Sequence, residues 1–222
     1  MTTLRILSLF PRHLDLNGCY GNVLCLAGRA EWRGIETEII EWIPGEPVPS
    51  DVDLVVCAGF APLSTVVALA PVFAAAGEGL RALRDAGVPI FANAAGWSLL
   101  GERLVVAPDG DRVDTARVFA TTEGIGAERK VGEYHVAGVA GFVNRGTVRI
   151  DAGELLRSGA SLATDIMGPF LPMNPSFADE FLTSALGRKG EMLPAPISPD
   201  LARADEAAAR ARTAIAVRLN RR

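Results

Sequence analysis

Residues 88–101 read VPIFANAAGWSLLG, an apolar run followed by small residues and then by a second apolar segment. The run from Val88 to Ala92 predicts a buried strand, and the residues from Asn93 onward predict a sharp turn into a helix. Such a turn can carry a reactive side chain at its tip and can present backbone N–H groups to an oxyanion. Ala94 stands at the expected tip without a reactive group, and an ordinary strand-to-helix turn would have the same composition.

Three apolar runs precede this strand, at Leu4–Phe10, Thr37–Ile43 and Asp53–Ala58. Helical segments are expected at 21–33 and 64–86. The apolar runs are continuous, which is typical of parallel strands covered on both faces. Alternating strands and helices predict a three-layer, doubly wound α/β domain with a mainly parallel sheet. We expect the strands at 4–10, 53–58 and 88–92 to lie in one sheet.

The second half of the chain changes character. Short Val-rich runs at 136–143 and 147–150 predict antiparallel or mixed sheet. Helices are expected over 176–186 and, after the helix start Ser198-Pro199-Asp200, over 199–218. We therefore expect residues 1–194 to form one α/β domain, and 195–222 to form a C-terminal helix that packs on this domain or extends it.

The composition limits the classes of partner and site that the chain is expected to have. The 222 residues are 49% apolar and carry a net charge of −4, so the chain offers no general field for a polyanion and nucleic acid is not expected as a partner. Three cysteines without a CxxC pair and two histidines predict neither a disulfide framework nor a metal site, and we expect no cofactor. The start lacks a signal-peptide pattern and no apolar run was found to reach about 18 residues, which predicts a cytoplasmic protein without a membrane span.

Five segments, in order, resemble motifs of the CobB/CobQ-type class I glutamine amidotransferases. Tyr20-Gly21-Asn22 resembles the opening of the family's first helix, and residues 56–59 (VCAG) resemble its oxyanion loop. Residues 93–101 lie where the family has its Cys-Gly-Gly-Tyr-Gln elbow. Residues 141–146 (GFVNRG) resemble a Gly-Phe-Glu-Asn-His-Gly segment, and 167–172 (MGPFLP) resemble a His-Gly-Pro stretch with its following Leu-Pro.

The resemblance covers nearly the whole chain and is strongest to the GatD-type glutaminase subunits, which pair with a Mur-ligase-like (MurT-like) subunit. It implies a flavodoxin-like class I amidotransferase fold and a cytoplasmic heterodimer with an ATP-dependent amide ligase. It also implies a binding site built from seven residues: Cys57, Ala58, Gly59, Ala95, Ser98, Asn144 and Arg145.

The departures from the family pattern bear on activity. Ala94 replaces the nucleophilic Cys, Met167 replaces the general-base His, Ser98 replaces a pocket Gln and Arg145 replaces a second His. Glutamine hydrolysis requires a thiolate that attacks the amide and an imidazole that moves protons. The chain is therefore expected to be a degenerate, non-catalytic subunit with no catalytic residue at positions 94 and 167.

Two alternatives stay open. The chain could be a repurposed enzyme that uses Cys57, His13 or an acidic residue at the same cleft, although a free cysteine is more often a small buried hydrophobe. It could also be a small-molecule binding module at the former glutamine site. His135 lies in an expected strand, and we expect it to have a structural role. Ser98 is likewise expected to cap a backbone carbonyl.

Overall fold

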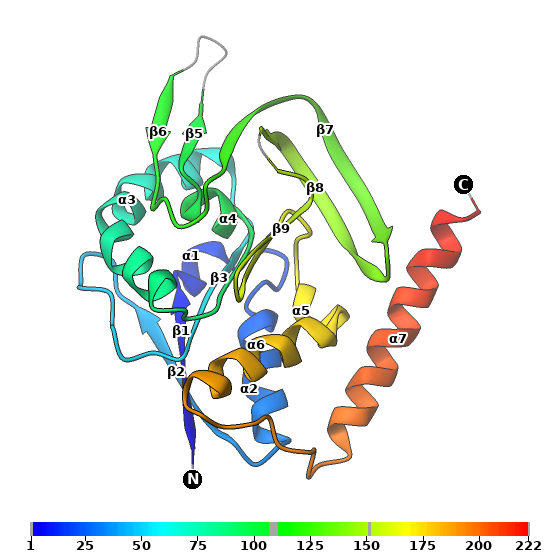
Figure 1. Cartoon of the computed structure of the whole chain (residues 1–222). Helices are drawn as coiled ribbons and strands as arrows, with labels where there is room; N and C mark the ends of the chain where they lie inside the picture. Colours follow the sequence, from blue (N-terminus) through cyan, green and yellow to red (C-terminus); the bar gives the residue numbers. More distant parts are fainter. Residues whose placement is uncertain (1, 107–110, 151, 222) are drawn as a thin grey trace.

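The computed structural model describes residues 2–106, 111–150 and 152–221. Figure 1 shows their course from the N-terminal strand to the C-terminal helix. The elements, in chain order, are β1 (Thr3–Leu9), α1 (Pro11–Leu14), α2 (Gly21–Glu31), β2 (Glu36–Trp42), β3 (Leu54–Gly59), α3 (Leu63–Asp85), β4 (Ile90–Ala94), α4 (Ala95–Leu100), β5 (Arg103–Val105), β6 (Arg112–Asp114), β7 (Thr122–Val136), β8 (Val139–Arg149), β9 (Leu155–Ser158), β10 (Ser161–Thr164), α5 (Phe170–Met173), α6 (Pro175–Arg188) and α7 (Asp200–Leu219).

The central sheet has six strands in the order β2-β1-β3-β4-β10-β9. All neighbours pair in parallel except β9, which pairs with β10 in the antiparallel sense. The first five strands follow the 2-1-3-4-5 order of flavodoxin-like doubly wound sheets. The predicted fold class is confirmed, and the three runs expected in one sheet lie there side by side as β1, β3 and β4.

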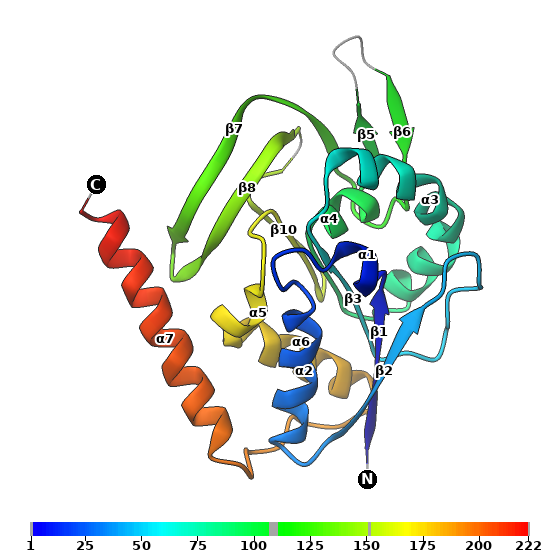
Figure 2. The same ribbon diagram turned by 180° about the vertical axis from the view of Figure 1, so that it is seen from behind.

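The apolar runs are continuous because the sheet is covered on both faces. In β3, Val55 and Cys57 belong to one core with α3 and α4, whereas Leu54 and Val56 belong to a second core with α2 and α6. Figures 1 and 2 show these helix pairs on opposite faces of the sheet. Every residue of β3 is buried, as expected for a central strand of a three-layer fold.

A second sheet, in the order β6-β5-β7-β8, rises from the carboxyl edge of the first. Its long hairpin β7–β8 arches away from the main body toward α7 (Figure 2). The antiparallel sheet expected from the Val-rich runs is present as β7 and β8, and the run 136–143 contains the turn between them: Ala137 and Gly138 adopt φ values of 49° and 82° in a two-residue turn. The helix α7 contacts β7, β8 and α5, and it buries Leu201, Ala208 and Ile215.

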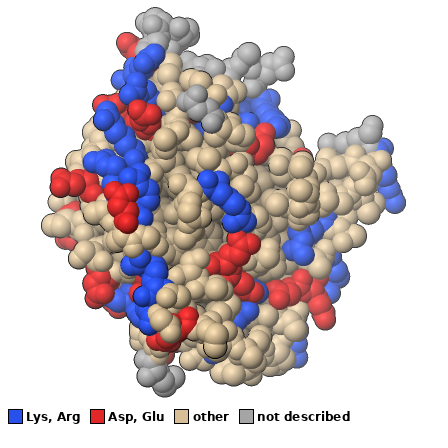
Figure 3. All heavy atoms as spheres, in the orientation of Figure 1, with Lys and Arg blue, Asp and Glu red and all other residues tan. Residues whose placement is uncertain are grey.

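The helix α3 corrects a second expectation. Its 23 residues are long and apolar enough, by length and composition alone, to cross a membrane. The expectation that no segment of the chain is long and apolar enough to span a membrane is therefore wrong. In this fold α3 covers the sheet with Phe73 and Leu80 fully buried. On the face drawn in Figure 3, basic and acidic side chains intermingle, which agrees with the small net charge.

Candidate functional site: a strained elbow without a nucleophile

The turn from β4 into α4 places Ala94 at the carboxyl edge of the central sheet. Ala94 has φ 47° and ψ −115°, a conformation that is rare for any residue other than glycine. Backbone strain of this kind costs about 1–3 kcal/mol and persists only where the surrounding structure enforces it. Nucleophile elbows hold their reactive residue on such a turn. The backbone of this chain thus has an elbow geometry, and its tip presents a methyl group.

Close backbone packing enforces the elbow. A Cβ atom on Gly96 would lie 1.7 Å from the carbonyl oxygen of Cys57, and one on Gly59 would lie 2.2 Å from Cβ of Leu14. Only glycine allows α4 and α1 to approach the end of β3 so closely. The carboxyl ends of β3 and β4 are therefore locked against the start of α4.

Asn93, one residue before the tip, ties three segments together. Its Oδ1 accepts a hydrogen bond from the N–H of Gly59 at 3.0 Å, and its Nδ2 donates to the carbonyl oxygens of Ile166 at 3.3 Å and Gly168 at 3.0 Å. The N–H of Phe60 donates to Leu14 O at 2.9 Å. The amide of Gly59, in the expected oxyanion loop, and the amide of Phe60 directly after this loop are thus already engaged within the protein.

A cavity of about 310 Å³ opens beside the elbow. Ala94, Ala95 and Ser98 form its floor, and apolar residues from the β3–α3 connection and α3 form one wall, namely Phe60, Ala61, Pro62, Leu63 and Val66. The opposite wall is polar and comes from β7, β8 and the residue after β10: Glu123, Arg129, Asn144, Arg145, Gly146, Thr147, Arg149 and Asp165. The cavity therefore has an apolar side and a charged side.

Arg149 is the centre of the charged side. It forms ion pairs with Glu123 and Asp165, both at 2.8 Å, and all three side chains are at least 90% buried. Its guanidinium lies 4.3 Å from the ring centroid of Trp97 and donates to Ala94 O at 3.3 Å. Arg149 thus closes the base of the cavity directly behind the elbow.

The ion pairs continue outward from this centre. Arg145 pairs with Asp165 and, at 3.0 Å, with Glu154, which also pairs with Lys130. Burial raises the pKa of Asp165 above its ordinary value, although Arg149 and Arg145 oppose the shift. The network holds three cations and three carboxylates, so its charges balance.

The structure brings together five of the residues named from the sequence. Ala94, Ala95, Ser98, Asn144 and Arg145 line the cavity. Ser98 Oγ donates to Ala94 O at 3.3 Å, which is the carbonyl-capping role considered for it.

Four other named residues do not line this cavity. Met167 lines a second cavity of about 470 Å³ beside β8, although its backbone segment is held next to the elbow through Asn93. Ala58 and Gly59 lie in β3 behind the elbow. Cys57 is fully buried, and burial strongly raises the pKa of its thiol, so it does not face the cleft as an attacking group.

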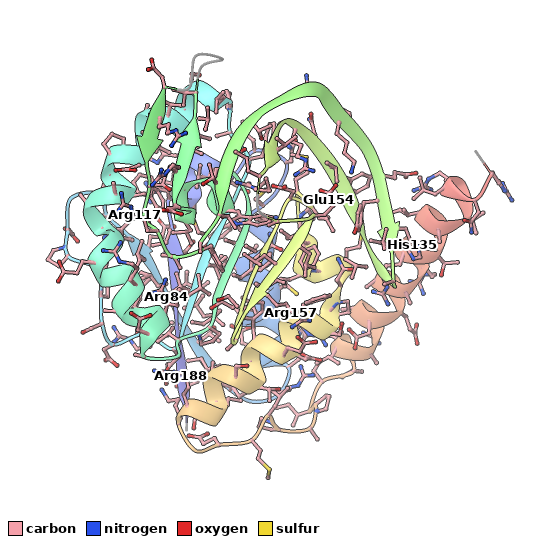
Figure 4. The ribbon with its side chains drawn as sticks, turned by 45° about the horizontal axis from the view of Figure 1, so that its top comes forward. Arg84, Arg117, His135, Glu154, Arg157 and Arg188 are labelled. Carbon is pink, nitrogen blue, oxygen red and sulfur yellow. The ribbon has the colours of Figure 1, made fainter. Side chains whose placement is uncertain are left out.

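The remaining candidate groups lie elsewhere. His13 is exposed on α1. His135 lies at the end of the β7–β8 hairpin, beside α7 and away from Glu154 (Figure 4). Burial raises the pKa of Cys19 to about 11 and that of Cys25 to about 12. Within the described ranges, no group of three or more His, Cys, Asp or Glu side chains could hold a metal ion.

Of the charged side of the cavity, only Asn144 and Arg145 were named from the sequence, through the family resemblance. Arg145, Thr147 and Arg149 alternate along β8, a pattern that normally indicates the solvent face of a strand. Asp165 could have been predicted as a site residue, because it directly follows β10 and the ligand crevice lies at the carboxyl ends of parallel strands.

The strain at Ala94 yields a stability prediction with an unusual sign. Ala94→Gly should raise the free energy of unfolding by about 1 kcal/mol, because relief of 1–3 kcal/mol of strain exceeds the added entropy of the unfolded chain. The control is Ala207→Gly on the exposed face of α7, which should lower it by about 1 kcal/mol. Chemical denaturation of both variants measures the difference. Destabilisation by Ala94→Gly would contradict the strained conformation.

Comparison with known proteins gives a distant likeness only. No protein-family model and no curated protein match the chain. A glutamine amidotransferase from Thermotoga maritima aligns over 96% of this chain and 93% of its own, with 13% identity and a TM-score of 0.47. DJ-1beta from Drosophila melanogaster aligns over 86% of this chain and 92% of its own, with 15% identity and a TM-score of 0.37. Sequence identities and TM-scores this low carry no information on activity. The function is therefore argued from the geometry of the site.

Proposed function

We propose that the chain is a catalytically degenerate glutamine amidotransferase-like subunit, of the GatD type, that does not hydrolyse glutamine. The observation that supports this proposal is the strained elbow with Ala94 at its tip. A methyl group cannot attack an amide, Met167 cannot move a proton, and the N–H of Gly59 is already bound to Asn93. Loss of both catalytic groups removes the covalent route as a whole, because such residues act as a unit.

The proposed partner is an ATP-dependent amide ligase of the Mur-ligase type. The site keeps backbone strain and buried charges although it lacks a nucleophile. Both features lower the stability of the fold. Their retention therefore supports a role of the site other than glutamine hydrolysis. Docking of a partner over the mouth of the cavity, near the elbow and Arg145, would give the fold such a role. Subunit function in the cytoplasm follows from the same proposal.

A glutaminase assay tests the first half of the proposal. The purified chain, alone and co-expressed with a candidate ligase, should release no glutamate from glutamine above the buffer background. Cys57→Ala serves as the matched variant, because the buried thiol should contribute nothing. Turnover that disappears in Cys57→Ala would instead support the repurposed enzyme.

Size-exclusion chromatography tests the second half. The chain and the ligase should elute together, and the ligase should change its activity when the chain is added. Separate elution with unchanged ligase activity would overturn the subunit proposal. The arginine-lined cavity would then favour the second candidate function, a small-molecule binding module.

A further inference from the structure

Arg129 is the cavity-lining cation that stands outside the balanced ion-pair network. Its Nε and one terminal nitrogen both donate to a single neutral acceptor, Asn144 Oδ1, at 2.9 and 2.6 Å. Among the described residues it forms no ion pair, whereas Lys130, Arg145 and Arg149 are each matched by a carboxylate. Counted over the residues that the structure describes, the charged side of the cavity therefore carries one unmatched positive charge, at an exposed position on β7.

The wall that faces these charges is apolar. Phe60, Leu63 and Val66 line it, and Leu63 keeps 40% of its surface exposed. A volume of about 310 Å³ lies at the lower end of the range for small-molecule sites. Such a cavity suits a short ligand with an apolar part and one charged end.

We propose that this cavity binds a small carboxylate with a short aliphatic chain, the carboxylate on Arg129 and the chain against Phe60, Leu63 and Val66. A guanidinium presents a planar fork of donors that matches a carboxylate, and the Asn144 amide beside it offers a further donor. One unmatched cation favours a monoanion. A dianion would bring a second negative charge toward Glu123 and Asp165, which line the same cavity.

The same charges disfavour a free amino acid. An ammonium group would require an unmatched carboxylate in the cavity, but Glu123 and Asp165 are both committed to arginines. The ligand should thus carry a carboxylate without an ammonium group, which separates it chemically from glutamine. The inference rests on the proposed function in one respect only: a site without a nucleophile binds its ligand without consuming it.

Calorimetric titration of the full chain tests the site with three matched probes: pentanoate, its neutral amide pentanamide, and the zwitterion norvaline. Pentanoate should bind at least tenfold more tightly than either of the others. Arg129→Gln should weaken pentanoate binding about tenfold or more, since a charge-assisted bidentate pair is lost. Arg210→Gln, on the exposed face of α7, should leave the affinity unchanged.

The outcomes are separable from those of the glutaminase assay. Thermal unfolding without ligand should be the same for Arg129→Gln and the unmodified chain, because Arg129 is exposed and forms no ion pair with the described residues. Equal binding of pentanoate and pentanamide, an unchanged affinity in Arg129→Gln, or no binding of pentanoate at about 10 mM would each overturn this site. None of these results would create or remove glutamate release, and glutaminase turnover would contradict the proposed function without touching the titration.

Discussion

Arg149→Met should lower the free energy of unfolding by about 3–5 kcal/mol, because it removes one member of a buried ion-pair network and leaves buried carboxylates without their guanidinium partner. Glu123 would lose its guanidinium partner, and Asp165 would retain only Arg145. Methionine keeps the apolar stem of the side chain but loses the guanidinium that lies over Trp97, so the loss includes this cation–π contact as well as the ion pairs. Urea denaturation of the variant measures the change.

Two further variants make this prediction specific. Arg210→Ala removes an exposed pair with Glu206 on α7 and should cost less than about 0.5 kcal/mol. In the double variant Arg149→Met/Glu123→Gln, neutralising the orphaned carboxylate should recover part of the lost stability. A cost of Arg149→Met below about 1 kcal/mol would mean that water reaches the network and that the charged wall is not a buried structure.

The central sheet could be predicted because its determinants are local. The run Asp53–Ala58 became β3, Leu54–Gly59, with every residue buried, since a strand covered on both faces needs apolar residues at every position. The strand expected from Val88 begins at Ile90, after Pro89, which lacks the N–H that a paired strand position uses. Small residues likewise marked the elbow, because a sharp turn and the close packing behind it exclude large side chains.

Apart from Asn144 and Arg145, which the resemblance named, the charged wall could not be predicted, because its burial is a tertiary effect. In the sequence, Arg145 and Arg149 belong to an alternating strand that would normally face solvent. They become buried because the β7–β8 hairpin returns over the elbow and brings β8 against Asp165 and Glu123, which lie 16 and 26 residues from Arg149. The hairpin turn at Ala137-Gly138 that makes this possible lies inside the Val-rich run 136–143, in which no turn was predicted.

Gly96→Ala should be the most damaging small substitution at the elbow, with a loss of about 3 kcal/mol or more. The added Cβ would lie 1.7 Å from the carbonyl oxygen of Cys57 and 2.6 Å from its carbonyl carbon. These are backbone atoms in the middle of the parallel sheet, so no side-chain rotation relieves the overlap. Either β3 or α4 must move, and each is fixed by the hydrogen bonds of Asn93 and by the core around Trp97.

Gly187→Ala is the matched control, because the same methyl group on α6 enters open space, with no atom within 4 Å beyond its chain neighbours and the backbone of its own helix. There the change should raise the stability by about 0.5–1 kcal/mol, through higher helix propensity and a less flexible unfolded chain. Opposite signs for one chemical substitution would tie the effect to the contact between α4 and β3. If Gly96→Ala were tolerated as well as Gly187→Ala, the close contact between α4 and β3 that holds Ala94 in its strained conformation would not exist. The strained elbow, which supports the proposed degenerate subunit, would then lose its basis.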